Sequence, residues 1–386
     1  MELNLASLLN PLDKEDFLQN YWGNKAIVIS SKSKEGFNSL FNWQKLNYLL
    51  NFHRLSYPDD IRFAKDGETL PPQPQKKWSS LLQQGTTLII NHIHELDPIL
   101  AQLALNIRYE LGHDVQINTY CTPSENKGFD CHYDTHEVII LQIDGEKEWF
   151  VLPPTIPSPI SSQRTINDLP PDSLPYLKVI LKPGDVLYIP RGHWHYAVSS
   201  GDRPSLHLTI GISCETGLDW LVWLTKKLQD SPLWRENLPL LPNGDSSKLQ
   251  KQLQILAQEL ATELQKPSWR EEYSKNLLIK QGSREGIKLP QQLGYDLFNK
   301  GLETRLWREK NQYFQIEKLS HNSLRVTIGS KQLDLQGEDL SVIRWILQQT
   351  EFSLLDLAEI APNLDWDKVI EPLLTQLIIE GIYFTN

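Results

Sequence analysis

The 386-residue sequence predicts an α+β protein with a central β domain flanked by helices. Between Asp114 and Cys214, seven short runs rich in β-branched and aromatic residues alternate with turn residues, which is typical of a sandwich, barrel or jelly roll. Residues 1–55 follow mainly a helical period, and the helical period returns after Cys214. The length exceeds that of one usual domain, so we expect two or three.

Composition excludes several classes of protein. Forty per cent hydrophobic residues and twelve Trp exclude intrinsic disorder as the main description. Three Cys without a CxxC pair argue against a disulfide framework or a thiolate zinc site. The sequence has no long uncharged apolar run, and its N-terminus carries acids where a signal peptide needs bases. We therefore expect a soluble cytoplasmic protein without membrane contact, and the net charge of −10 argues against a nucleic-acid binder.

The order of elements before and within the β region follows from local patterns. Asp66–Lys77 is polar and Pro-rich, so we expect a surface loop, followed by a short strand at Leu88–Asn91 and a helix at Pro98–Leu111. Pro153–Pro175 is expected to be an excursion between strands. The seven predicted strands are VQINTY, EVIILQI, EWFVL, LKVIL, DVLYIP, HYAVSS and LHLTIGI.

A helix of about five turns is predicted after the β region, at residues 246–265. It carries an apolar stripe of five leucines, Leu249, Leu253, Leu256, Leu260 and Leu264. Two interpretations of the stripe stay open, packing within its own domain and a helical dimer seam.

The C-terminal region predicts a winged-helix arrangement, with short helices separated by a turn, a longer helix and a terminal strand. Its last 56 residues, 331–386, contain three basic and ten acidic residues, so this element would repel phosphate and is interpreted as a protein-packing element. The expected strands are Tyr313–Leu319, Leu324–Ile328 and a shorter third at Gln332–Leu335, and the expected helices are Leu340–Gln349, Ser353–Ala361 and Trp366–Glu380, followed by a strand at Gly381–Phe384.

The first segment that contains candidate functional residues is CHYDTHE, residues 131–137. On a strand, His132 and Asp134 would point to the same face, because the side-chain period is two. An imidazole and a carboxylate side by side can occupy adjacent positions on a metal, and a third ligand would complete the two-His-one-carboxylate triad of non-haem Fe(II) oxygenases. Alone, the HxD pair is a weak signal, since an ordinary His–Asp hydrogen bond is common.

A second segment, GDVLYIPRGHWH, raises the significance of the first. It predicts a strand, a tight Pro-x-Gly turn, and a histidine at the start of the next strand. His193 and His195 share strand parity, so the residues alone leave the third ligand open between them. His136 is in phase with His132 as well, and each surplus histidine is interpreted as a residue near the ligands or on the surface.

Lys147 is the next candidate. Asp144-Gly145 between two apolar runs predicts a two-residue hairpin, in which Lys147 pairs with Gln142 and points to the face of His132 and Asp134. A buried ammonium needs an anion, so this lysine would bind a substrate carboxylate. The alternative is a solvated lysine on a charged hairpin.

Together, HYDTHEVIILQIDGEKEWFVL and KPGDVLYIPRGHWH resemble the JmjC-type 2-oxoglutarate oxygenases of the cupin superfamily, in particular the ribosomal oxygenase branch. The second segment also resembles the broader cupin motif Gly-x5-Pro-x-Gly-x2-His, whose spacing selects His195 over His193. The resemblance implies a double-stranded β-helix (jelly roll) core, and an Asp at position 134 is the variant expected for Fe(II) and 2-oxoglutarate.

For the site, the resemblance implies Fe(II) ligands His132, Asp134 and His195, with Lys147 on the distal carboxylate of 2-oxoglutarate. Asn118, Tyr120 and Thr209 are expected to line the cosubstrate pocket, although core packing explains them nearly as well. His136 and His193 depart from the expected pattern.

For the whole chain, the resemblance implies a catalytic domain at 1–215, a helical dimerisation segment at 216–305 and a winged-helix-like domain at 306–386. The implied activity is hydroxylation of a side chain in a ribosomal or other protein by a homodimeric enzyme. The alternatives are a natural-product peptide or small-molecule substrate, lysine demethylation, and a non-enzymatic metal-binding module that recruits a partner.

Overall fold

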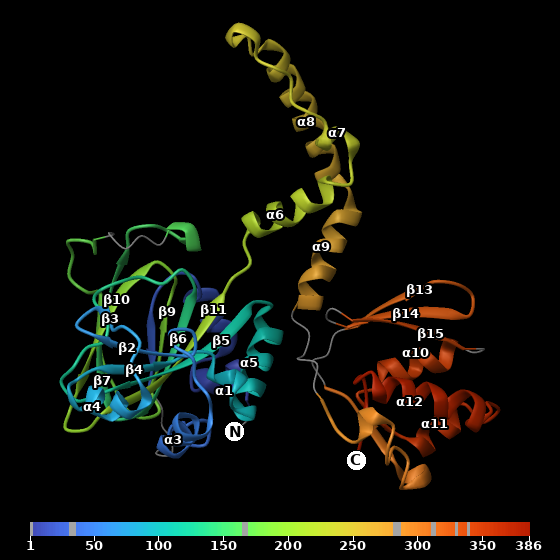
Figure 1. The fold of residues 1–386 in the computed structure, drawn as a ribbon, viewed down its shortest axis with the longest axis horizontal. Coiled ribbons are helices and arrows are strands. Elements are labelled where there is room, and N and C mark those ends of the chain that lie inside the picture. Colours follow the sequence, from blue (N-terminus) through green and yellow to red (C-terminus); the bar gives the residue numbers. More distant parts are fainter. Residues whose placement is uncertain are drawn as a thin grey trace. The chain divides into compact units, whose positions relative to one another are not determined.

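The computed structural model describes residues 3–30, 36–163, 169–280, 287–309, 314–328, 331–337 and 340–386. The chain divides into two units, Met1–Glu215 and Thr216–Asn386 (Figure 1). The expected division into three domains, with a further boundary near residue 305, stays a prediction.

Two antiparallel sheets form the centre of the first unit, as expected for a jelly roll (Figure 1). All seven strands predicted between Asp114 and Cys214 are present, so this prediction is confirmed. In spatial order the large sheet contains β1 (Ile27–Ile29), β9 (Val186–Ile189), β6 (Glu137–Asp144), β11 (Ser205–Ser213), β5 (Asp114–Thr122), β4 (Thr87–Ile90), β2 (Ile61–Lys65) and β3 (Glu68–Thr69). The small sheet contains β10 (His193–Ser200), β7 (Glu146–Pro154) and β8 (Leu177–Leu181).

Alternation along the strands gives the large sheet two different faces. The even-numbered residues of β11 belong to the main apolar core, and the odd-numbered ones face the other way. The core residues of this strand are Leu206, Leu208, Ile210 and Ile212. In β6, Val138 and Ile140 belong instead to a smaller cluster that includes Trp149 and Val151 of the small sheet. The interior between the sheets is therefore distinct from the core beneath the helices.

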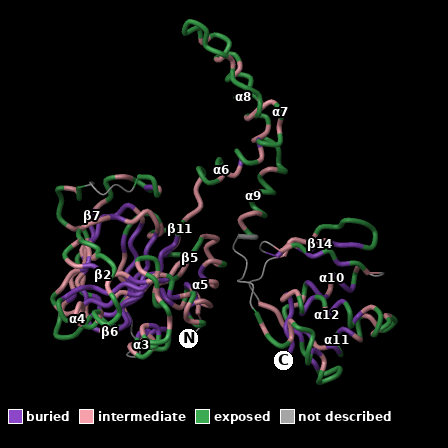
Figure 2. Tube along the Cα trace, in the orientation of Figure 1, coloured by how far each residue is buried: buried purple, intermediate pink, exposed green. Residues whose placement is uncertain are grey.

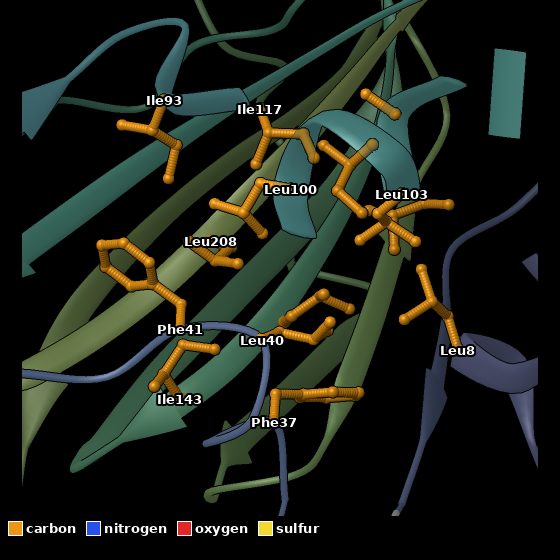
Figure 3. Close-up of a cluster of buried hydrophobic side chains, with 14 of the residues drawn as sticks. Leu8, Phe37, Leu40, Phe41, Ile93, Leu100, Leu103, Ile117, Ile143 and Leu208 are labelled. Atoms are coloured by element: carbon orange, nitrogen blue, oxygen red, sulfur yellow. The ribbon is translucent and has the colours of Figure 1, made fainter. Parts of the chain in front are cut away.

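Helices cover the outer face of the large sheet (Figure 1). The helix α5 (Pro98–Leu111) begins where the Asp97 side chain accepts hydrogen bonds from two backbone N–H groups, and it ends at Gly112 with φ of 72°. Figure 3 shows its Leu100 and Leu103 packed among side chains of the N-terminal segment and the strands. Further helices of this unit are α1 (Leu5–Leu9), α2 (Lys14–Asn20), α3 (Trp43–Phe52) and α4 (Trp78–Gln83), with short turns η1 (Gln75–Lys77), η2 (Ile93–Glu95) and η3 (Ser161–Gln163).

Two local predictions for this unit are wrong in detail. Asp66–Lys77 is not only a loop, because it contains β3 and η1. Asp144-Gly145 does not join a hairpin: β6 pairs with β9 and β11, and β7 pairs with β8 and β10. Gly145, at φ of 65°, lies where the chain passes from one sheet to the other, and a Cβ there would come within 2.2 Å of the Pro204 carbonyl oxygen. The local turn signal is real, but the strands it joins belong to different sheets.

The second unit begins with helices that bury little of their surface (Figure 2). The predicted helix at 246–265 is present as α8, and none of its residues is buried. Within the described residues this segment contains α6 (Gly217–Leu228), α7 (Pro232–Arg235), α8 (Ser247–Gln265) and α9 (Pro267–Lys280), with η4 (Pro242–Gly244) before α8.

The rest of the second unit has its own apolar core, to which Leu306, Ile346, Leu374 and Tyr383 contribute. Its helices agree with those expected, and Tyr313 of the first expected strand lies outside the described residues. One sheet has the order β16 (Glu351–Ser353), β12 (Arg305–Trp307), β17 (Phe384–Thr385), and another has the order β13 (Gln315–Lys318), β14 (Ser323–Ile328), β15 (Lys331–Gln336). The helices are α10 (Leu340–Gln348), α11 (Leu354–Ile360) and α12 (Glu371–Ile379), with turns η5 (Gln291–Leu293), η6 (Gly301–Glu303) and the π-helical η7 (Trp366–Ile370). Among the described residues, no helix is long and apolar enough to cross a membrane.

Candidate metal and cosubstrate site

His132, Asp134 and His195 come together in the first unit, with ligand atoms that all lie within 4.8 Å of one another. His195 is on β10, one residue after the strand register shifts. The sequence had predicted a strand for His132 and Asp134. In the structure both residues lie instead on an irregular segment between β5 and β6. A single β-bridge between His132 and His195 holds this segment against β10.

Backbone carbonyl groups orient both imidazole rings. Nδ1 of His132 lies 2.7 Å from the carbonyl oxygen of Asp130, and Nδ1 of His195 lies 3.0 Å from that of His193. A carbonyl oxygen only accepts, so each Nδ1 donates its proton. In the neutral rings Nε2 then carries the lone pair, which is the arrangement usual for metal-binding histidines.

The electrostatics of the cluster favour a cation at its centre. Nε2 of His195 lies 3.6 Å from Oδ2 of Asp134. This pair is not a salt bridge, because burial lowers the pKa of His195 to about 4 and the ring is neutral. A nitrogen lone pair and a carboxylate oxygen therefore face each other, and a cation between them would relieve the repulsion. Two imidazoles and one carboxylate are a donor set that fits Fe(II).

A cavity of about 790 Å³ opens beside this cluster. Its wall includes the inner faces of two neighbouring strands: Gln116, Asn118 and Tyr120 of β5, and His207, Thr209 and Gly211 of β11. Side chains from the small sheet, including Lys147 and Trp149, line it as well. In these strands polar residues alternate with leucines, isoleucines and valines that belong to the main apolar core. The strand period of two therefore places the polar residues on the cavity side.

Lys147 lies in this cavity as expected, but the strand pairing that places it there differs from the predicted one. Its partners across the small sheet are Ser199 and Leu181, and not Gln142. The side chain is buried, and its Nζ donates to Oγ1 of Thr122 at 3.1 Å. Burial lowers the pKa of Lys147 to about 7, and in the described part of the chain no carboxylate forms an ion pair with it. An ammonium in this position needs an anionic ligand.

The three further expected residues also line the cavity. Asn118 and Thr209 are opposite each other in the β5–β11 register, and Oδ1 of Asn118 accepts a hydrogen bond from the His92 amide at 2.9 Å. Tyr120 stacks on His207 with ring centroids 4.9 Å apart and planes 3° apart. His207 and Trp149 were not predicted from the sequence as residues of the cavity. The alternation in SLHLTIG puts His207 on the face of Thr209, and this pattern could have predicted His207.

The two surplus histidines have different positions. His136 lines the cavity but is not part of the ligand cluster. His193 is not among the lining residues; its Nδ1 lies 2.7 Å from the hydroxyl of Tyr176. The interpretation as a residue near the ligands fits His136, whereas the side chain of His193 is buried and does not line the cavity, so it is not on the surface.

A second cluster that could hold a metal, His92, His94 and Glu95, lies near the cavity wall. Nδ1 of His94 accepts a hydrogen bond from the Ile117 amide at 3.2 Å. This bond uses the lone pair of Nδ1, and the proton of the neutral ring is then on Nε2. His94 is therefore a poor ligand, and the cluster with His132 is the better metal site.

Comparisons with known proteins match the part of the chain that contains this site to one domain family. The family model of the JmjC domain matches residues 91–219. The bifunctional lysine-specific demethylase and histidyl-hydroxylase NO66 of Drosophila persimilis is 31% identical over 217 residues, which are 53% of this chain and 31% of that protein. Ribosomal oxygenase 1 of Rattus norvegicus is 31% identical over 213 residues, 53% of this chain and 36% of that protein. The chain thus spans about a third of the length of these curated relatives.

Solved structures show the same fold over a larger part of the chain. The ribosomal oxygenase YcfD of Escherichia coli in complex with cobalt and 2-oxoglutarate has a TM-score of 0.59 at 15% identity, covering 97% of this chain and 99% of that one. A second YcfD crystal structure has a TM-score of 0.58, with 97% and 98% covered. The matched residues 91–219, which contain all seven site residues expected from the sequence, are therefore similar to the JmjC domain, and the chain has the fold of the two YcfD structures.

Proposed function

We propose that this chain is an Fe(II)- and 2-oxoglutarate-dependent dioxygenase that hydroxylates an amino-acid side chain of a protein substrate. The observation that carries the proposal is that one cavity is lined by His132, Asp134, His195 and the buried Lys147. The names of the relatives support it, since the curated ones are called histidyl-hydroxylase and ribosomal oxygenase and one solved structure holds cobalt and 2-oxoglutarate.

In this proposal, His132, Asp134 and His195 bind Fe(II) through two Nε2 atoms and a carboxylate oxygen. When bound there with 2-oxoglutarate and dioxygen, the iron supplies the oxidation that inserts one oxygen atom into a C–H bond of the substrate, while 2-oxoglutarate becomes succinate and CO2. The carbonyl oxygens of Asp130 and His193 keep each ring in the required tautomer.

Lys147 would orient the cosubstrate through its distal carboxylate. Its ammonium is fixed by Oγ1 of Thr122, which also accepts a hydrogen bond from the Thr87 hydroxyl at 3.0 Å. The ring of Trp149 lies 5.8 Å from Nζ and shields the charge from water. An anion bound here gains from the low local dielectric.

The size of the cavity supports a second, larger ligand beside the cosubstrate. Its volume of about 790 Å³ lies in the upper part of the usual range for ligand sites, roughly 300–1,000 Å³. A five-carbon dicarboxylate leaves room there for the side chain of a peptide.

The direct test incubates the purified full chain with Fe(II), 2-oxoglutarate and peptides from ribosomal proteins. The expected result is a product heavier by one oxygen atom, formed in equal amount with succinate. His195→Ala is expected to abolish both products, and the matched control His321→Ala, an exposed histidine of the second unit, is expected to retain them. Product formation without 2-oxoglutarate, or equal activity of His195→Ala, would refute the proposal.

We further propose the domain scheme and assembly expected from the sequence. The division into 1–215, 216–305 and 306–386 is supported by a first unit that ends at Glu215 and by a separate core that includes Leu306 and Tyr383. The helices α10, α11 and α12 with the three-stranded sheet β16-β12-β17 support a winged-helix domain. Its acid excess favours a role in protein packing over nucleic-acid binding. The cytoplasmic location stays a prediction.

Homodimerisation is supported by the helical segment. No residue of α8 is buried, although the helix carries the stripe Leu249, Leu253, Leu256, Leu260 and Leu264. In α6, Leu218, Leu221 and Val222 are exposed as well. An amphipathic helix whose apolar face is only partly covered by the described part of its own chain gains stability by packing against a second copy.

A further inference from the structure

His207 is a buried polar residue beside Lys147 for which the proposed ligand set has no role. It extends from β11 into the cavity and is only 2% exposed. Its Nδ1 is buried and has no hydrogen-bond partner among the described residues. Burial, and then the positive charge of Lys147, hold the pKa of the His207 ring well below its usual value, so the ring is neutral.

The surroundings hold this ring in one place. Tyr120 stacks on one face, and Trp149 meets the ring edge-on with centroids 5.6 Å apart and planes at 81°. Trp149 also carries the ammonium of Lys147 over its face, so a single indole contacts both polar groups. Two groups that can donate hydrogen bonds, one cationic and one neutral, thus contact the same indole and line the same cavity.

This arrangement is costly in the absence of a ligand, because a buried nitrogen without a partner destabilises the fold. Packing alone does not account for the cost, because a phenylalanine would stack between the same aromatic neighbours without a polar atom. A ligand with two adjacent acceptor atoms would satisfy both His207 and Lys147, and a carboxylate has that geometry.

We propose that His207 is a second binding residue for the distal carboxylate of the cosubstrate, donating its ring N–H to one oxygen while Lys147 pairs with the other. The inference rests on the proposed function, because it concerns the same dicarboxylate. It makes the site selective for a dicarboxylate over a 2-oxo acid that ends in a methyl group. His207 acts here in binding, and it is not part of the metal-ligand cluster.

The test measures binding by calorimetry, with the full chain loaded with Mn(II) and titrated with 2-oxoglutarate or with pyruvate. His207→Phe keeps an aromatic ring and removes the donor, whereas His207→Asn keeps an N–H near the position of Nδ1. A hydrogen bond to a charged group predicts that His207→Phe weakens 2-oxoglutarate binding about 10- to 100-fold. Pyruvate affinity is expected to stay unchanged, and His207→Asn is expected to recover most of the loss.

Each outcome separates this inference from the proposed function. If the wild-type chain binds neither 2-oxoglutarate nor pyruvate in the presence of Mn(II), the proposed function fails and the inference fails with it. If the wild type binds 2-oxoglutarate and His207→Phe binds it equally well, only the inference is overturned. Equal losses for 2-oxoglutarate and pyruvate in His207→Phe would indicate a structural role and would also overturn it. The thermal midpoint of metal-free His207→Phe is expected to be at least that of the wild type, because the variant removes an unpaired buried nitrogen.

Discussion

His132 and His195 donate backbone hydrogen bonds to each other, from His132 N to His195 O at 3.1 Å and from His195 N to His132 O at 2.7 Å. The two residues are 63 positions apart in the sequence, and their ring centroids are 4.6 Å apart. Gly192 N also donates to Asp134 O at 2.8 Å, so the turn before β10 holds the backbone of Asp134, the carboxylate ligand of the proposed set. Main-chain bonds thus set the spacing of the three side chains without requiring a metal.

The first prediction concerns removal of a proposed ligand. Because backbone bonds fix the segment, Asp134→Ala and His132→Ala are expected to fold like the wild type. Their affinity for Mn(II) should fall by more than the roughly 100-fold that the loss of an outer-sphere partner can cost. Calorimetry with Mn(II) measures the affinity, and circular dichroism checks the fold. Unchanged binding in either variant would remove that residue from the site.

The second prediction is that Lys147→Met stabilises the ligand-free protein and abolishes dicarboxylate binding. In the folded chain burial lowers the pKa of Lys147 to about 7, from an ordinary value of 10.5. Burying the ammonium is therefore a cost that methionine does not have, and the gain in unfolding free energy is expected to be on the order of 1–3 kcal/mol at neutral pH. Urea unfolding of the metal-free protein measures it. Lys178→Met, at a largely exposed side chain, is the control and should change little.

The pH dependence of this gain has a defined sign. Between pH 7 and 10.5 the unfolded chain holds the Lys147 proton while the folded chain has released it, so the contribution of Lys147 to stability improves as pH rises. Below pH 7 both states are protonated and the full cost of the buried ammonium applies. The advantage of Lys147→Met should therefore be largest below pH 7 and disappear towards pH 10.5. A difference that grows with pH would contradict the buried-ammonium explanation.

The third prediction concerns Glu137, which connects the two ligand-bearing segments through its carboxylate. Oε2 accepts a hydrogen bond from the Tyr188 hydroxyl at 2.5 Å and from the Arg191 amide at 3.3 Å, and Oε1 lies 3.7 Å from Nε of Arg191. Glu137 is 2% exposed. Glu137→Leu leaves Arg191 and Tyr188 without this partner and is expected to destabilise the fold by about 3–5 kcal/mol.

Glu137→Gln should be milder, because an amide can still accept from Tyr188. Urea unfolding distinguishes the two variants, and Mn(II) affinity is expected to fall in the order wild type, Glu137→Gln, Glu137→Leu. Equal stability of all three proteins would show that the carboxylate does not hold these segments together.

The fourth prediction tests the proposed dimer through α8. Leu256→Glu with Leu260→Glu places charges on the apolar stripe, and light scattering with size-exclusion chromatography is expected to show a monomer. Gln258→Glu, an exposed position on the same helix, should leave the dimer intact and serves as the control. A monomeric wild type, or a double variant that stays dimeric, would count against the seam.

The site was predictable from sequence to the extent that its signals are local. The Pro-x-Gly turn before His193 and the alternation of β5 and β11 are short-range features, and both are present in the structure. Lys147 shows the limit of such reasoning. The Asp144-Gly145 turn signal predicted correctly that Lys147 points into the cavity, but it did so from a pairing with Gln142 that the structure does not have. A turn signal contains no information on which sheet the next strand joins.

By itself, the sequence determined the seven strands between Asp114 and Cys214, the helices at 98–111 and 246–265, the HxD pair and the two histidines that were candidates for the third ligand. It did not reveal short strands such as β1 and β12. Only the tertiary structure placed Nε2 of His195 against the Asp134 carboxylate, and only it showed that Lys147 has no carboxylate partner among the described residues and that His207 lines the same cavity. The physical reason is that these properties depend on burial and on contacts between residues tens of positions apart. Such contacts are set by the pairing of whole strands and not by the residues next to each group.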